Sequence, residues 1–262
     1  MSNHDIKSRI GEGLEALSDS AKWAEYRKGK IRDVAGRFDI KTCEAFADYL
    51  NTVMIAVINA HKGNEVYKTW RTKDKTEKKQ FAQDIVNTFI DYIISDIWND
   101  RVTMYNSDGT LYRKEKIRTR QENDYFDRLY KEDITHKPNV VVTDFPDGLM
   151  GVAPTGELII NFDHMFYKSL VVFLMDLRHE LDHIVNMFFP NIHPLALLGS
   201  DRLAAMRYYV QPHEDGDLYA DNPVEISANL KRGEFAEMCS LAVAGKPWNE
   251  PRNVNSPKEI EH

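Results

Sequence analysis

Cysteine is scarce in this sequence. Only Cys43 and Cys239 occur among the 262 residues, and they lie far apart along the chain. Two cysteines argue against a disulfide framework and against a cysteine-rich zinc site, because both need several thiols. A metal ion in this chain would therefore be held by histidine and carboxylate side chains, a donor set typical of catalytic rather than structural zinc.

The sequence also lacks a clean apolar run and an excess of basic residues. The best candidate for a membrane span, residues 170–189, is interrupted by six charged or histidine residues. The 34 Lys and Arg against 41 Asp and Glu give a net charge of −7, which argues against a general nucleic-acid binder. The N-terminus is polar and has no apolar signal-peptide core. We expect no membrane or nucleic-acid partner and a cytoplasmic location by default, with export by a signal-less secretion route as the alternative.

The pattern of apolar residues divides the chain into three parts. Residues 1–132 have helical periodicity, with a capping box at Asp74 and Glu77 before one predicted helix. In residues 133–245, the β-branched run 140–142 and the alternation over 157–162 predict strands, and a long helix follows. Residues 246–262 have no apolar periodicity, so we expect a disordered tail. The predicted fold is α+β and predominantly helical, with a helical N-terminal region packed on a core that contains a small mixed or antiparallel sheet.

The long helix carries the pentad His179-Glu180-Leu181-Asp182-His183. Two histidines four residues apart on a helix share one face, so both imidazoles can reach one zinc ion at about 2.0–2.1 Å. Glu180 then stands beside the metal, where it can accept a proton from water. The leucine stripe of this helix points the other way. The alternative is therefore that the histidines are polar residues on the outer face and that Glu180 is solvated.

A catalytic zinc site usually has a third protein ligand. The candidates downstream are His193, His213, Glu214, Asp215, Asp217, Asp221 and Glu225. We favour Glu225, because Asn222 suits the N-cap of a helix and Pro223 suits its first position. Glu at the third helical position also suits a capping box, so ligand and cap are competing roles for this carboxylate.

Two related motifs do not fit. The metzincin pattern needs Gly and His where this chain has Asn186 and Phe189. Asp182 gives the pentad the H-E-x-D-H form of peptide deformylases, but no cysteine lies between Cys43 and the pentad. Asp182 then either orients a histidine or pairs with Arg178 one turn earlier.

A strand just ahead of an H-E-x-x-H helix, followed by E-x-x-A at residues 225–228, resembles the gluzincin-type zinc metallopeptidases over about residues 138–240. The resemblance implies a peptide or protein substrate bound in extended form along an edge strand at residues 158–162. For the oxyanion that forms during hydrolysis, the candidate donors between the two ligand helices are Tyr208, Tyr209, His213 and Tyr219, of which we select Tyr208 and His213.

The sequence thus predicts a hydrolase that cleaves peptide bonds with narrow specificity. His179, His183 and Glu225 hold Zn²⁺, and Glu180 is the general base. The alternative function is a non-catalytic zinc-binding interaction or sensor protein with a peptidase-like fold.

Overall fold

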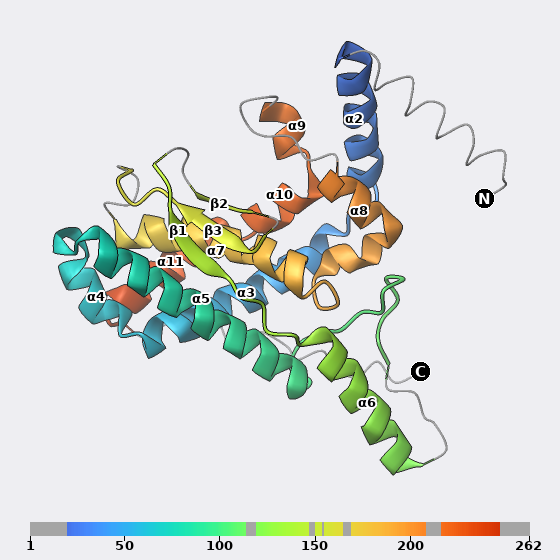
Figure 1. Ribbon diagram of the computed structural model, residues 1–262, viewed down its shortest axis with the longest axis horizontal. Coiled ribbons are helices and arrows are strands. Elements are labelled where there is room, and N and C mark those ends of the chain that lie inside the picture. The colour runs from blue at the N-terminus through green and yellow to red at the C-terminus, as the bar shows by residue number, and fades with distance from the viewer. Residues whose placement is uncertain are drawn as a thin grey trace.

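The computed structural model describes residues 20–113, 119–146, 150–153, 155–164, 169–207 and 216–246. It is predominantly helical with one small sheet, as predicted (Figure 1). The α-helices are α2 (Ser20–Ala35), α3 (Ile40–Ala60), α4 (Gly63–Thr69), α5 (Lys75–Trp98), α6 (Arg120–Ile134), α7 (Leu170–Phe188), α8 (Ser200–Arg207), α9 (Gly216–Ala220), α10 (Pro223–Asn229) and α11 (Arg232–Val243). Two 3₁₀ helices, η1 (Trp70–Thr72) and η3 (Pro194–Leu198), and three strands, β1 (Val141–Asp144), β2 (Met150–Val152) and β3 (Glu157–Ile160), complete the described elements.

The capping box predicted for α5 is confirmed. The Asp74 carboxylate accepts a hydrogen bond from the Glu77 backbone N–H at 2.9 Å, and the Glu77 carboxylate accepts one from the Asp74 N–H at 3.0 Å. These two bonds satisfy donors that every helix N-terminus leaves without an intrahelical partner. The start of α5 is therefore set locally by the sequence.

The sheet has the order β1-β3-β2 and is mixed. β3 lies in the centre, parallel to β1 and antiparallel to β2. The prediction that an extended substrate binds along residues 158–162 as an edge strand is therefore wrong in its choice of strand. Residues 158–160 already pair on both sides, so their backbone groups are not available for a further strand.

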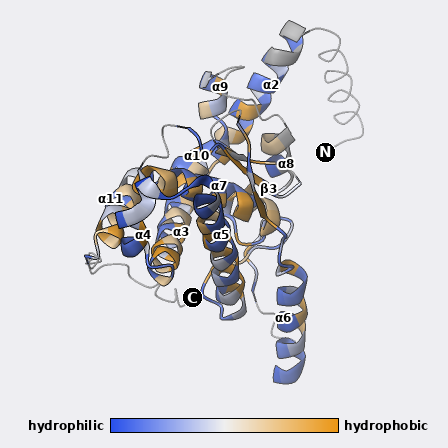
Figure 2. Ribbon diagram, turned by 60° about the vertical axis from the view of Figure 1, so that its left-hand side comes forward, coloured by the Kyte–Doolittle hydropathy of each residue, from blue (hydrophilic) through white to orange (hydrophobic). Residues whose placement is uncertain are grey.

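The main hydrophobic core combines side chains from the N-terminal helices and from the later part of the chain. It includes Ile58 of α3, Phe89 of α5, Leu174 of α7 and Phe235 of α11, all buried. Figure 2 shows β3 mainly in hydrophobic colours and α6 mainly in hydrophilic ones, and α6 projects from the rest of the molecule. The helical N-terminal region and the later part of the chain thus share one hydrophobic core, and the secondary structure changes from helices to strands shortly after residue 132.

Helix α7 is buried on its polar side as well as along its apolar stripe. The stripe Leu170, Leu174, Leu177, Leu181 and Ile184 is buried, as the periodicity predicts. The rest of α7 packs against α3, α10 and α11, so the pentad is enclosed between helices instead of lying on an outer face. His179 is only 8% exposed and Glu180 only 7%. The alternative of a solvated pentad is therefore wrong.

None of the helices in the described ranges combines the length and apolar character that a membrane span requires. The predicted tail at residues 246–262 lies, apart from Lys246, outside the described residues.

Candidate metal centre

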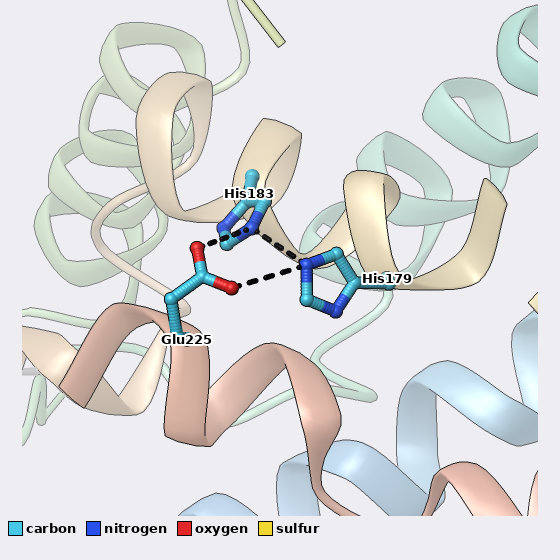
Figure 3. A group of neighbouring side chains, drawn as sticks. All are labelled: His179, His183 and Glu225. Carbon is cyan, nitrogen blue, oxygen red and sulfur yellow. Dashed lines mark hydrogen bonds and ion pairs between the residues drawn. The ribbon is translucent and has the colours of Figure 1, made fainter. Parts of the chain in front are cut away.

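The two histidines of the pentad point toward one another from successive turns of α7 (Figure 3). Their Nε2 atoms are 3.1 Å apart, and the rings meet edge to face with centroids 4.7 Å apart. This arrangement follows from the helix, because residues i and i+4 lie one above the other on the same face. Both Nε2 atoms are thus presented to the same small volume.

Glu225 reaches the same volume from α10. One carboxylate oxygen lies 3.4 Å from Nε2 of His179, and the other lies 3.2 Å from Nε2 of His183. Glu225 is only 1% exposed. Within the described ranges, these three residues are the group whose donor atoms come together closely enough to hold a metal ion. The structure therefore brings together the three residues that the sequence singles out, although Glu225 follows His183 by 42 residues in the chain.

The donor atoms are close enough together to share one metal ion. Donors about 2.0–2.1 Å from a tetrahedral zinc ion lie about 3.3–3.4 Å from each other. The two Nε2 atoms are 3.1 Å apart, each is 3.2 or 3.4 Å from a different oxygen of Glu225, and one donor atom from each residue lies within 4.8 Å of the others. Two imidazoles and a carboxylate also form a donor set found in catalytic zinc sites. The residues present therefore fit the metal that the pentad implies.

The capping role that competed for Glu225 is filled by other groups. The Asn222 side chain accepts a hydrogen bond from the Val224 N–H at 2.9 Å and so caps α10 itself. The Asn222 backbone N–H donates to the Tyr219 carbonyl at 3.1 Å, so it does not need the glutamate that a capping box would supply. The Glu225 carboxylate is turned toward the histidines instead.

Among the other candidates for a third ligand, those in the described ranges do not join this group. Asp217 and Asp221 are exposed. His193 is fully buried, and its Nε2 faces Asp182 at 3.1 Å. His213, Glu214 and Asp215 lie outside the described residues. So do Tyr208, Tyr209 and His213, three of the four residues named as oxyanion donors.

Tyr219, the fourth, lies in α9 beside the site. Its side chain hydrogen bonds to Glu225, and this bond is one of the contacts that lower the pKa of that carboxyl group. Burial raises the pKa of Glu225, but hydrogen bonds from His179, His183 and Tyr219 outweigh it. Glu225 therefore remains ionised, as a ligand carboxylate must. The residue pattern allowed Tyr219 but could not single it out from its neighbours.

Glu180 is close to all three donor residues without being one of them. Its burial raises its pKa above the usual value, and the charges of His183 and His179 partly oppose this shift. A carboxylate with a raised pKa is a better proton acceptor near neutral pH. Glu180 is therefore a buried carboxyl group of raised pKa next to His179 in the chain.

Asp182 hydrogen bonds to a histidine, but not to one of the pentad. Its Oδ1 lies 3.1 Å from Nε2 of His193. The other alternative, a pairing of Asp182 with Arg178, holds only as an interaction of charges: Arg178 contributes to the lowered pKa of Asp182, but its guanidinium donates to Asn51 and to two backbone carbonyls. The sequence gives no local signal for these partners: His193 follows Asp182 by 11 residues, beyond the end of α7, and the partners of Arg178 are 50 to 131 residues away.

Protons compete with metal at this site, which predicts a pH dependence. Burial lowers the pKa of His183, but the hydrogen bond to Glu225 and the charges of Glu180 and Glu225 outweigh it and raise the pKa to about 9. A metal ion binds only the neutral imidazole, so below pH 9 a proton must leave first. We expect the zinc Kd to fall about tenfold per pH unit between pH 7 and 8, as measured by chelator competition. A Kd that does not change over this range would contradict the expectation.

The chain matches no protein-family model, and no curated protein or solved structure is significantly similar to it. The function of the site must therefore be argued from its own geometry.

Proposed function

We propose that this protein is a zinc-dependent hydrolase that cleaves peptide bonds and acts on a narrow set of substrates. The proposal rests on the convergence of His179, His183 and Glu225, whose donor atoms lie within 4.8 Å of one another. A second buried carboxyl group with a raised pKa, that of Glu180, lies on α7 together with the two histidines. Three protein donors and an adjacent base are the components of a hydrolytic zinc site.

The chemistry that a bound zinc ion supplies is a lowered pKa of water, from 15.7 toward about 7, at the coordination position that three protein ligands leave open. Glu180 accepts the proton of the attacking water on its carboxylate and passes it to the leaving amine, a role typically worth about 10²–10⁴-fold in rate. Glu225 contributes the negative charge that keeps both histidines oriented toward one point. Tyr219 holds the Glu225 carboxylate through its hydrogen bond.

An extended peptide is the substrate class that the sheet favours. In the described part of the chain, β2 pairs with β3 on one side only, and it packs against α7. A substrate segment that adds to the other side of β2 would form backbone hydrogen bonds there and would run alongside the helix that carries the pentad. This replaces residues 158–162, whose backbone groups are already paired, as the expected binding strand.

Metal removal tests the proposal. After dialysis against a zinc chelator, we expect the protein to lose cleavage of a diverse peptide and protein library, as measured by mass spectrometry of the new termini. Adding one equivalent of Zn²⁺ should restore the same cleavages, whereas Mg²⁺ should not, because it prefers oxygen ligands in octahedral geometry.

A zinc-loaded protein that cleaves nothing in the library would contradict the proposal. It would favour the second candidate, a non-catalytic zinc-binding interaction or sensor protein. The burial of His179 and Glu225, with His183 half-buried, is compatible with that role as well.

A further inference from the structure

A second buried polar cluster lies where α7, α10 and α3 meet. Arg178, the residue before His179, has no exposed surface. Its Nε donates to the Asn51 side-chain oxygen at 2.9 Å, Nη1 to the Ala228 carbonyl at 2.7 Å, and Nη2 to the Ala47 carbonyl at 3.3 Å. Burying a cation is costly, and the three acceptors that contact it are neutral. The charges of Asp182 and Asp48 offset part of this cost, but neither carboxylate is hydrogen-bonded to the guanidinium. The direct contacts of Arg178 thus go to Asn51 and to backbone carbonyls of α10 and α3.

Two of the contacts in this cluster hold the C-terminal end of α10. The Ala228 carbonyl belongs to the last turn of α10, where carbonyl groups have no partner within the helix. Arg178 supplies that partner across the helix interface. The Asn51 side chain, which Arg178 orients, also donates to the Lys231 carbonyl just after α10 at 3.4 Å. The end of α10 is thus tied to α7 and α3 by side chains.

A further tie joins the same helices through His193. Its Nδ1 accepts a hydrogen bond from the Leu195 N–H at 3.2 Å, so the ring hydrogen is on Nε2 and is donated to Asp182 of α7. The Ser227 hydroxyl of α10 lies 3.5 Å from the same Nε2. Ser227 is two residues from Glu225, and Ala228 is three residues from it. Both ties therefore act within one helical turn of the third ligand.

We propose that Arg178 is a positioning residue for the zinc site: by fixing the end of α10, it sets the place of the Glu225 carboxylate before any metal binds. This inference rests on the proposed function. Ala228 and Glu225 are about 4.5 Å apart along the helix axis, so a shift of the anchored end moves the carboxylate with it. Zinc–ligand distances tolerate only about ±0.2 Å, and a small movement of α10 is enough to weaken the site.

The substitution Arg178→Lys tests this. Lysine keeps the charge but cannot span three acceptors, because its ammonium is a single point donor on a flexible stem. We expect the zinc Kd of the folded variant to rise about 10–100-fold, the range found for residues that orient metal ligands. We also expect the visible spectrum of the Co²⁺-loaded variant to change, because the metal geometry loosens when Glu225 is misplaced.

Lys131→Arg is the control. Lys131 of α6 is also a buried cation, only 3% exposed; it donates to the Trp98 carbonyl at 3.3 Å and forms ion pairs with Asp100 and Asp127 at 2.6 and 3.2 Å. None of these groups belongs to α7 or α10. We expect this variant to lose stability but to keep the wild-type zinc Kd and Co²⁺ spectrum.

The results of these measurements distinguish a failure of the Arg178 inference from a failure of the proposed function. A purely structural role of Arg178 predicts the same loss of Tm with and without zinc and an unchanged Kd, and this result would overturn the inference alone. If Arg178→Lys does not fold, Asn51→Leu is the second variant: it removes both the acceptor that orients the Arg178 guanidinium and the donor to the Lys231 carbonyl. An unchanged zinc Kd in this variant overturns the inference, and a Kd raised a few-fold supports it. A wild-type protein that binds no zinc overturns both this inference and the proposed function.

Discussion

Replacing Glu180 with Gln should abolish measurable hydrolysis and leave zinc binding nearly intact. The amide has almost the same shape as the carboxylate, so the packing of α7 is retained, but it cannot accept a proton at neutral pH. Because Glu180 is close to the donor group without belonging to it, its loss should not remove a ligand. We expect kcat to fall by about 10²–10⁴-fold, as measured on a substrate identified from the peptide library.

Glu237→Gln is the control for this variant. Glu237 is an exposed glutamate of α11, so the same chemical change there should leave kcat and zinc content at wild-type values. If Glu180→Gln keeps full activity with zinc bound, Glu180 is not the base. If it loses zinc as well as activity, Glu180 acts in holding the metal.

The second large effect concerns Glu225. Glu225→Gln should weaken zinc binding on the order of 10³-fold, because a neutral amide oxygen replaces one of three charged or strongly donating ligands. The carboxylate is also the partner of both histidines in the folded protein, at 3.4 and 3.2 Å. Its removal should therefore lower the pKa of His183 from about 9 toward the usual range for histidine. Both quantities are measurable, the first by chelator competition and the second by NMR titration of the imidazole.

Asp221→Asn is the control for this variant, because Asp221 is an acidic residue that does not belong to the group formed by His179, His183 and Glu225. Asp221 is exposed in the turn between α9 and α10, so its neutralisation should change neither the zinc Kd nor the His183 pKa. Equal zinc affinities for Glu225→Gln and the wild type would show that the third ligand is another residue.

The parts of the fold that the sequence predicts are those with local causes. The capping box of α5 needs only Asp74 and Glu77, three residues apart. The start of α10 needs only Asn222 and Pro223, and the apolar stripe of α7 follows from a period of 3.6 residues. The facing of His179 and His183 also follows from one helix, which is why the pentad is so informative.

The parts that the sequence does not predict depend on tertiary packing. The central place of β3 follows from its pairing with β1 and β2 together, and a single alternating segment gives no sign of how many neighbours it has. Arg178, Asn51 and Asp182 meet partners up to 131 residues away, and no spacing rule reaches that far. Glu225 is intermediate, because its helix was predictable while the direction of its side chain was settled by the packing of α10 on α7.

X-ray absorption at the zinc edge of the purified, zinc-loaded protein shows which atoms surround the metal. We expect one zinc per chain with only nitrogen and oxygen neighbours at about 2.0–2.1 Å, among them two imidazoles. In His183→Ala the imidazole signal should drop to one ring. A sulfur neighbour at about 2.3 Å, or a shell of the wild type without imidazole, would contradict a centre built from His179, His183 and Glu225.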